Sequence, residues 1–529
     1  MIYFILSVIP ALIYNAYKMK KSFHMLQQNW YNDDQRYFKW LIKNYNKTFI
    51  QIDMFFVIFI IGLFLSEKTL MIFYVIFYLL VIYLYKKQKR LEQNKKPLVF
   101  TKRIRRLTIT TCILYLILLL GITLFYKNEY LTYYYLIISL LIYLNYFVVM
   151  SANFINKPWE KLVYNYYFNK AKNKLKNMSN LEVIGITGSY GKTSSKNILS
   201  DILNIKYDAL KTPKNFNTTY GLMRTINNDL DKFTEYFIAE MGAFKRGEIK
   251  QLCDFVKPKY GILTTIGSAH LDTFGSRENI MKGKFELIES LPSNGVAILN
   301  KDDEYQTSYK LKNNCKVLWI GIDNKDADLY ATNIKLNKDG TSFDCIFKND
   351  NNKYHFETKL LGKANVYNIL ASIMLGYTLN ISIEQLKLGV LKVKPVEHRL
   401  ELKKYLDINI IDDAYNSNPV GAKMALEVLD MMPGKKIVVT PGMIELKDKE
   451  YELNLEFGKE IAKVADEVIL IGKEQTKPIY EGLLLEHYKE KDIHILNDVK
   501  QAFPLMQKLK GKETYVLLEN DLPDIFNEN

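Results

Sequence analysis

The stretch "VIGITGSYGKTSSKNIL" combines an apolar run, a loop of small residues and a lysine–threonine pair that opens a helical pattern. Gly188 and Gly191 can adopt backbone conformations that turn N–H groups toward phosphate oxygens. Lys192 would reach the β- and γ-phosphates of a nucleotide, and the Thr193 hydroxyl would ligate Mg²⁺. The stretch therefore predicts a phosphate-binding loop between a strand and a helix.

Two later apolar runs end in side chains that would complete a metal site. Glu240 closes the run "FIAE", His270 follows "YGILTTIGSA", and Lys284 lies further along a helical pattern. Ligands of open parallel sheets bind at the carboxyl ends of the strands, so we expect Glu240, His270 and the phosphate loop to converge. Each residue also has a structural interpretation, as a helix cap, a loop histidine and a surface lysine respectively.

The elements that must position these residues form an alternating α/β pattern, which is typical of parallel sheets covered by helices. A break near Lys394–His398 divides the region into two α/β units. The expected strands are Val183–Thr187, Tyr236–Met241, Tyr260–Ile266, Val296–Asn300, Val317–Gly321, Ile408–Asp412, Lys436–Thr440, Glu467–Gly472 and Thr514–Glu519.

The first 150 residues have a different character and predict an α-helical transmembrane domain. The apolar stretches are Ile2–Tyr14, Phe49–Ser66, Thr69–Tyr85, Leu107–Tyr126 and Tyr130–Met150. The last four approach the ~20 residues that cross a bilayer, whereas the first is short and contains a proline. The alternative is a buried helical bundle of a soluble protein.

The loops of this region predict its orientation. The segment "KKQKRLEQNKKPLVFTKRIRR" is strongly basic, whereas the connections at residues 67–68 and 127–129 are short and nearly neutral. Basic loops stay in the cytoplasm, so the N-terminus is expected outside and everything after Met150 inside a bacterial cytoplasmic membrane. The net charge of +15 is interpreted as membrane topology and contact with anionic lipid, not as nucleic-acid binding. The four cysteines show no CxxC or metal-ligand spacing.

A set of motifs then resembles the Mur ligase family, most closely its MurF group. The matching segments, in the family's order, are "GITGSYGKTSS", "EMGAFKRGEI", "TTIGSAHLDTFGSRENIMKGKFELIE", "AILNKDD", "GKANVYNILAS", "EHRLE" and "IDDAYNSNP". The apolar stretches predict a membrane domain over residues 1–150, followed by a linker over 151–180. The resemblance implies a central ATP-binding domain with a phosphate loop over 181–395 and a Rossmann-like α/β C-terminal domain over 396–529.

The resemblance also implies roles for individual residues. Thr193, Glu240, His270 and Lys284 match magnesium positions, and Lys284 matches the lysine that this family carbamylates, giving an anionic oxygen ligand. Asn368 matches an adenine contact, and Arg399 and Asp413 match residues that close on phosphate and ribose. The implied catalytic residues are Lys192, Lys284, His270 and Glu240. The implied nucleotide-binding residues are Gly188, Ser189, Gly191, Lys192, Thr193, Ser194, Asn365, Asn368, Arg399, Asp413 and Asn416, with Tyr415 and Asn418 completing the last loop.

The implied reaction is ATP-dependent peptide ligation in cell-wall precursor synthesis. A substrate carboxylate attacks the γ-phosphate of ATP, and an amine then displaces phosphate from the acyl phosphate. The implied cofactors are ATP and Mg²⁺. The implied partners are a UDP-linked or lipid-linked muropeptide, an amino acid or dipeptide, membrane lipid, and no nucleic acid; a partner in a cell-envelope complex is left open.

Three departures from the family pattern concern substrate recognition and adenine packing. The family's soluble UDP-sugar-binding domain has no counterpart, because the apolar region fills its place. Ala364 stands where the family has a histidine, and the chain ends with "VLLENDLPDIFN", which carries Glu519 and further acids in place of a basic turn. These departures raise the hypothesis that the precursor is lipid-linked.

Other functions remain open at this point. A membrane-associated ligase that makes a poly-γ-glutamate type of polymer would also combine this site with apolar segments. Folylpolyglutamate synthesis is disfavoured because its soluble substrate needs no membrane domain. A non-catalytic ATP-binding scaffold or a transporter ATPase would belong to another class. Retention of Lys192, Glu240, His270 and Lys284 argues against a scaffold, and the other signature motifs of a transporter ATPase are not visible in the sequence.

Overall fold

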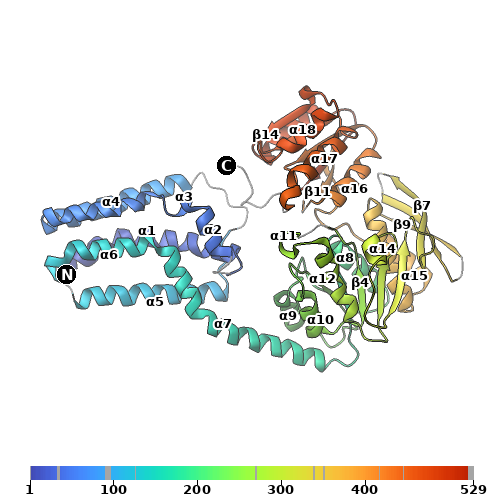
Figure 1. Ribbon diagram of the computed structural model, residues 1–529, viewed down its shortest axis with the longest axis horizontal. Coiled ribbons are helices and arrows are strands. Elements are labelled where there is room, and N and C mark those ends of the chain that lie inside the picture. Colours follow the sequence, from blue (N-terminus) through green and yellow to red (C-terminus); the bar gives the residue numbers. More distant parts are fainter. Residues whose placement is uncertain are drawn as a thin grey trace. The chain divides into compact units, whose positions relative to one another are not determined.

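The computed structural model describes residues 2–31, 36–89, 97–125, 127–267, 271–337, 340–349, 352–415, 417–444 and 446–521. It forms two compact units, Met1–Tyr166 and Tyr167–Asn529, each of which is described by itself. Figure 1 shows a helical first unit and a second unit built from two sheets with helices on their faces.

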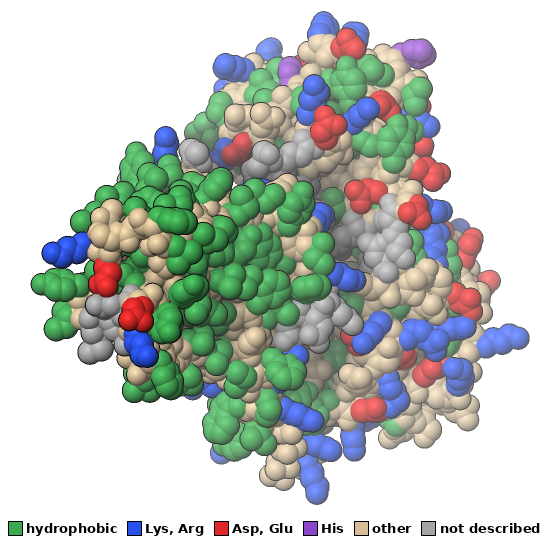
Figure 2. Space-filling model, turned by 60° about the vertical axis from the view of Figure 1, so that its left-hand side comes forward, with side chains coloured by type: hydrophobic (Ala, Val, Ile, Leu, Met, Phe, Trp, Pro, Cys, Tyr) green, Lys and Arg blue, Asp and Glu red, His purple; other side chains and the backbone are tan. Residues whose placement is uncertain are grey.

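The first unit is a set of long apolar segments that run back and forth beside one another (Figure 1). Its long elements are α1 (Ile2–Gln28), η2 (Ile52–Phe64), α4 (Glu67–Lys89), α5 (Lys102–Leu124) and α6 (Leu131–Tyr143), and its short ones are α2 (Phe38–Lys43), α3 (Tyr45–Thr48) and η3 (Asn128–Tyr130). Aromatic rings fill the interior, where Tyr74 stacks on Tyr135 with ring centroids 4.0 Å apart. The outer surface is apolar as well, as Figure 2 shows on its visible face and as the exposed Phe55 and Phe64 illustrate.

The lengths of these elements correct part of the expectation of five spans. By length and composition, α1, α4 and α5 are candidate membrane spans, and α6 with α7 (Asn145–Lys176) would be a fourth if the pair, bent by 69°, is one span. The stretch predicted at Phe49–Ser66 instead forms the 13-residue 3₁₀ helix η2. Because a 3₁₀ helix rises about 2.0 Å per residue, η2 covers ~26 Å, where an α-helix of this length would cover ~20 Å.

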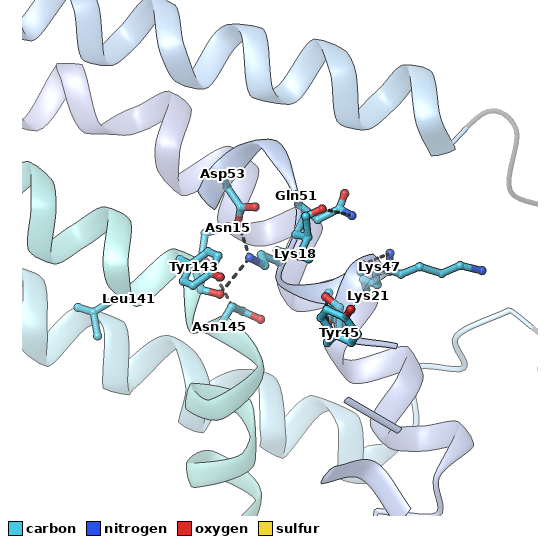
Figure 3. Close-up of polar contacts among 12 residues, drawn as sticks. Asn15, Lys18, Lys21, Tyr45, Lys47, Gln51, Asp53, Leu141, Tyr143 and Asn145 are labelled. Atoms are coloured by element: carbon cyan, nitrogen blue, oxygen red, sulfur yellow. Dashed lines mark hydrogen bonds and ion pairs between the residues drawn. The ribbon is translucent and has the colours of Figure 1, made fainter. Parts of the chain in front are cut away.

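A buried ion pair joins three elements at one end of this unit (Figure 3). Lys18 of α1 is 3% exposed and pairs with Asp53 at the start of η2. The Lys18 ammonium also donates to the backbone carbonyl of Tyr143, at 3.0 Å, where α6 ends. A cation at a helix C-terminus is favoured because it satisfies a carbonyl that has no partner within the helix. The pair therefore stabilises the end of α6, where the chain turns into α7.

Asn145 supports the same turn from the first residue of α7. Its side-chain amide donates to the Asn15 oxygen at 2.8 Å and to the Tyr115 hydroxyl at 3.1 Å. Helix α7 continues to Lys176 and so covers both the predicted boundary at residue 150 and most of the predicted linker.

The second unit begins with a nine-stranded sheet in the order β2-β3-β1-β4-β5-β6-β7-β8-β9. Neighbouring strands in this order are parallel from β2 through β1 to β7. The pairs β7–β8 and β8–β9 are antiparallel. The strands are β1 (Glu182–Thr187), β2 (Ala209–Lys211), β3 (Tyr236–Glu240), β4 (Tyr260–Leu263), β5 (Val296–Asn300), β6 (Lys316–Gly321), β7 (Leu329–Asn337), β8 (Gly340–Phe347) and β9 (Lys353–Thr358). The helices are α8 (Lys192–Leu203), α9 (Thr219–Asn228), α10 (Glu248–Val256), α11 (Leu271–Phe274), α12 (Arg277–Glu289), α13 (Glu304–Thr307), α14 (Lys363–Thr378) and α15 (Ile383–Lys392).

A six-stranded sheet follows, in the order β10-β11-β15-β12-β13-β14, with only β10 antiparallel to its neighbour among the pairs described. Its strands are β10 (Glu401–Tyr405), β11 (Ile408–Asp413), β12 (Lys435–Thr440), β13 (Glu467–Ile471), β14 (Ile493–Leu496) and β15 (Thr514–Glu519). Its helices are α16 (Pro419–Asp430), η4 (Lys447–Lys449), α17 (Glu450–Ala462), α18 (Lys477–Leu485), η5 (Glu490–Asp492), η6 (Val499–Gln501) and α19 (Ala502–Leu509).

All nine strands expected from the sequence are present in the two sheets, with ends that differ by up to three residues. The α/β architecture predicted for both domains is therefore confirmed. The strands β2, β7 to β9, β10 and β14 were not expected. Most of them lie at sheet edges, where one face is solvated and the continuous apolar run of a buried parallel strand is missing.

Candidate active site

The strand order brings the predicted site residues to one edge of the nine-stranded sheet. Strand β1 lies between β3 and β4, and Ile186 pairs in register with Glu240. The phosphate loop follows β1, Glu240 ends β3, and the segment 264–267 follows β4. Because the three strands are parallel, their carboxyl ends meet at the same edge. His270 lies outside the described residues, so the structure does not place the histidine of the predicted metal set.

The phosphate loop is shaped by two glycines. Gly188 has φ +152° and Gly191 has φ +79°, and Gly191 is the residue that precedes the first turn of α8. A Cβ at Gly188 would lie 2.0 Å from the Thr264 hydroxyl oxygen, so a larger residue would displace the neighbouring loop. The Ser189 N–H donates to the Thr265 carbonyl at 2.7 Å, which fixes the loop against the segment after β4.

Lys192 lies over the loop that it follows. Its ammonium donates to the carbonyls of Gly188, at 2.8 Å, and Ser189, at 3.0 Å. Burial lowers the pKa of Lys192 to about 8, with Glu240 opposing the shift and Arg399 adding to it. A bound phosphate would supply the anion that the ammonium lacks in this position, and would favour its charged form.

A second group of residues surrounds the carboxylate of Glu240, which is 1% exposed. The Thr193 hydroxyl lies 3.2 and 3.1 Å from its two oxygens, and the Asn217 amide lies 3.3 Å from one of them. The ammonium of Lys196 lies 2.9 Å from the other oxygen. Sequence reasoning missed Lys196 and Asn217. A signal for Lys196 was its position four residues after Lys192, on the same side of the helix that opens at the phosphate loop.

Lys284 has a different environment, because its amine is buried without a hydrogen-bond partner among the described residues. It lies 5.4 Å above the ring of Phe274. Burial, together with the nearby charge of Lys192, lowers the pKa of Lys284 to about 7. A neutral amine is the nucleophilic form of lysine, so this environment suits addition of CO₂.

The described side chains fit a magnesium ion in part. Thr193 and Glu240 offer adjacent oxygen ligands, which Mg²⁺ prefers. A carbamate on Lys284 would add an oxygen ligand. No group of three or more His, Cys, Asp and Glu side chains suited to a metal is found among the described residues. The predicted set does not require one, since only Glu240 and His270 of its four members are of those types.

A pocket of about 120 Å³ lies between the two sheets of the second unit. The phosphate loop and α14 form one wall, and residues of the C-terminal domain form the other. Six of the predicted nucleotide-binding residues line it: Gly191, Ser194, Asn365, Asn368, Arg399 and Asp413. Ala364 and Asn418 also line it, whereas Asn416 lies outside the described residues. The small Ala364 side chain therefore borders the same space that the predicted adenine contact Asn368 borders.

The C-terminal wall carries a cation and a carboxylate. The guanidinium of Arg399 lies 4.2 Å from the centre of the Tyr415 ring, and the Leu400 N–H donates to Asp413 at 3.2 Å. Burial raises the pKa of Asp413 to about 6, although Arg399 opposes the shift. The Asn215 amide of the central domain donates to the Tyr415 hydroxyl at 2.8 Å. The pocket therefore receives side chains from both domains, which also contact each other beside it.

The end of β15 lies beside the C-terminal wall of the pocket. Glu519 is the register partner of Asp413 and is fully buried. One of its oxygens accepts from the Ser417 hydroxyl at 2.5 Å, and Asn520 donates to the Gly442 carbonyl at 2.6 Å. Burial and the neighbouring Asp413 raise the pKa of Glu519 well above its usual range. Glu519, the first acid of the segment noted as a departure, thus lies beside Asp413 of this wall.

A phosphate loop, an adjoining set of oxygen ligands and a nucleotide pocket shared with a second α/β domain define an ATP-using ligase of two domains. Comparison with known proteins agrees. The chain matches the Mur ligase middle domain over residues 186–376 and the Mur ligase, glutamate ligase domain over residues 398–519.

Individual relatives agree with the family models. The UDP-N-acetylmuramoyl-tripeptide--D-alanyl-D-alanine ligase of Bacillus subtilis (strain 168) is 33% identical over 330 residues, which cover 60% of this chain and 70% of the relative. The Escherichia coli (strain K12) enzyme of that name is 29% identical over 58% of this chain and 68% of its own length. The structure of MurF ligase from Thermotoga maritima in complex with ADP matches with a TM-score of 0.60 and 28% identity, over 67% of this chain and 80% of that one. The chain belongs to the Mur ligase family and is an ATP-dependent ligase that forms carbon–nitrogen bonds.

The ionisation of Asp413 gives a prediction for nucleotide binding. Its carboxylate would accept hydrogen bonds from the two hydroxyls of a ribose, and protonation below a pH of about 6 removes its charge and turns one of its two acceptor oxygens into a donor. We expect the KM for ATP to rise as pH falls through about 6, by about tenfold per pH unit below the pKa. Asp413→Asn should raise KM at neutral pH and lose this pH dependence. An unchanged pH dependence in the variant, measured by steady-state kinetics, would assign the titration to another group.

Proposed function

We propose that this chain is a MurF-like ligase that joins an amino acid or dipeptide to the peptide carboxylate of a cell-wall precursor at the cytoplasmic membrane. The observation that carries the proposal is the pocket between the two sheets, which Gly191 of the phosphate loop and Ser194 line together with Arg399 and Asp413 of the C-terminal domain. The chain also matches about two thirds of the length of two relatives named UDP-N-acetylmuramoyl-tripeptide--D-alanyl-D-alanine ligase. This similarity supports the same class of reaction.

The chemistry assigns each side chain a distinct task. The loop N–H groups and the Lys192 ammonium would hold the β- and γ-phosphates while the substrate carboxylate attacks the γ-phosphorus and ADP leaves. The bond from the amine nitrogen to the acyl carbon then forms, the acyl–phosphate bond breaks, and phosphate leaves with the electron pair while the nitrogen loses a proton. Magnesium, held by Thr193 and Glu240 with His270 and a carbamylated Lys284, would screen the repulsion between the two anions.

The C-terminal domain would complete the site around the nucleotide. Arg399 would neutralise phosphate charge, and Asp413 would orient the ribose. Both side chains line the pocket from the C-terminal domain. Beside them, the Tyr415 hydroxyl accepts a hydrogen bond from Asn215 of the central domain. Closure of the two domains would exclude water from the acyl phosphate, which hydrolysis would otherwise destroy.

The apolar first unit bears on which acceptor the ligase uses. The family matches begin at residue 186, so the apolar unit lies outside them. A ligase held in the membrane would meet a precursor linked to a lipid carrier as readily as one linked to UDP. We therefore include the lipid-linked muropeptide as a second candidate acceptor.

The assay that tests this function uses full-length protein in detergent with ATP, Mg²⁺, D-Ala-D-Ala and either UDP-MurNAc-tripeptide or its lipid-linked form. Phosphate release coupled to amide product is expected with at least one acceptor, and the preferred acceptor decides between the two candidates. Lys192→Ala should reduce turnover by at least about a hundredfold, whereas Lys250→Ala, on the exposed side of α10, should leave it unchanged. Activity with neither acceptor would overturn the substrate assignment, and ATP binding without any ligation would favour the scaffold.

Membrane insertion is supported by the candidate spans and by the distribution of charge. Lys86, Lys87 and Lys89 end α4 and Lys102 begins α5, so these cations lie at the end of the unit where α1 finishes (Figure 1). The nearly neutral connections near residues 67 and 129 lie at the other ends of these helices, before α4 begins and after α5 ends. The positive-inside rule then places the basic end, and the chain that follows α7, in the cytoplasm.

A thiol-labelling experiment tests this topology. In a Cys112→Ser background, which removes an exposed native thiol, Lys68→Cys should react with a membrane-impermeant reagent in intact cells. Lys87→Cys should react only after the cells are permeabilised. The protein should also stay with the membrane fraction after an alkaline carbonate wash. Labelling of Lys87→Cys from outside would reverse the topology, and release by carbonate would exclude insertion.

A further inference from the structure

Lys196 is a buried cation at the proposed metal site that the ligase chemistry above does not use. It lies on α8 and is 1% exposed. Its ammonium is 2.9 Å from Glu240 and also donates to the carbonyl of Lys214. A lysine so deeply buried is costly unless its charge is compensated, and Glu240 is the carboxylate with which it forms an ion pair.

Glu240 has the complementary problem. Its carboxylate is 1% exposed. Two neutral groups contact it, the Thr193 hydroxyl and the Asn217 amide, and the Lys196 ammonium is the charged group that contacts it. Neutral donors compensate a buried carboxylate only in part, because desolvation of an ionised group costs several kcal/mol. Lys196 therefore supplies the positive charge that directly contacts the Glu240 carboxylate in this structure.

The Lys196–Glu240 ion pair also contacts the segment 212–218. Lys196 contacts the Lys214 carbonyl, Asn217 contacts Glu240, and the Thr212 hydroxyl accepts from the Glu240 N–H at 3.2 Å. The orientation of the carboxylate is therefore set from the helix after the phosphate loop and from this segment together, before any cation arrives.

We propose that Lys196 is a positioning residue that acts as the resident counter-cation of Glu240 and makes divalent-cation binding depend on the nucleotide. With Lys196 in place, Glu240 is already neutralised, so Mg²⁺ alone gains little from it. The phosphates of ATP add negative charge to the site, and Mg²⁺ then enters with them. The inference rests on the proposed function for the assignment of Glu240 as a metal ligand.

The test measures Mg²⁺ binding without catalysis, by calorimetry and by the thermal unfolding midpoint of the full-length protein in detergent, in chelator and in Mg²⁺ without nucleotide. Wild type is expected to bind Mg²⁺ weakly and to show little stabilisation. Lys196→Met keeps the side-chain volume but removes the charge, so it should be less stable in chelator. Its affinity for Mg²⁺ should rise on the order of tenfold, because a nearby positive charge no longer opposes the ion.

Two further variants separate this role from a packing role. Lys196→Met combined with Glu240→Gln should fold without metal and show no Mg²⁺ response, because neither buried charge remains. Lys259→Met removes a part-exposed ion pair with Glu182 in the same domain and should leave the Mg²⁺ response at the wild-type value. These readouts need no acyl or amine substrate, so they hold whether or not the proposed ligation is found.

The outcomes are distinct. Stabilisation of Lys196→Met by Mg²⁺ beyond that of wild type supports the proposal, as does a variant that can be purified only with Mg²⁺. A Mg²⁺ response equal to that of wild type overturns it. It is also overturned if Lys196→Met fails to fold even with Mg²⁺ while the double variant folds, because Mg²⁺ would then not replace the lysine charge.

Discussion

The ionised carboxylate of Glu240, buried at the edge of the central sheet, is the constraint on which the catalytic end of this protein depends. A buried charge persists only where a cation and hydrogen-bond donors surround it. The fold supplies them because β3 lies beside β1, so that Glu240 faces the first turns of α8. Thr193 and Lys196 then reach the carboxylate from that helix, and Asn217 reaches it from the segment before α9.

The same edge concentrates positive charge where phosphates would bind. The Lys192 ammonium donates to the carbonyls of its own loop, and Arg399 lines the pocket from the C-terminal domain. Burial lowers the pKa of Lys192, and the positive charge of Arg399 adds to that shift. A polyanionic nucleotide would relieve the repulsion between these cations, which come from both domains.

The sequence predicted the architecture well where burial is continuous. The nine buried strands were predictable because parallel strands covered on both faces are apolar throughout. The phosphate loop was predictable because Gly188, Gly191 and Lys192 follow an apolar run and open a helical pattern, although Ile186 replaces the first glycine of the strict motif. The strands β7 to β9 were missed because an antiparallel edge alternates polar and apolar residues. Among the described residues, three helices, or four with the bent pair, are long and apolar enough to be candidate spans where five were predicted, because the apolar run at Phe49–Ser66 forms a helix of only 13 residues.

The site was predicted less completely, for reasons of residue type. Lys196 and Asn217 are of types that are usually solvated, so the sequence did not distinguish them from surface residues. Their role follows only from the strand order that places Glu240 beside them. Glu519 was noted as a departure from the family pattern, but its contact with Ser417 depends on the register of β15 with β11. His270 and Asn416 stay predictions, because they lie outside the described residues.

The proposed ligation requires that the site activates a carboxylate as an acyl phosphate. The direct measurement places a heavy-oxygen label in the carboxylate of the muropeptide acceptor and follows the label during amide formation by the full-length protein. The account predicts that one labelled oxygen leaves with the released phosphate for each amide formed. Amide formation with unlabelled phosphate, or with the label in AMP, would contradict it.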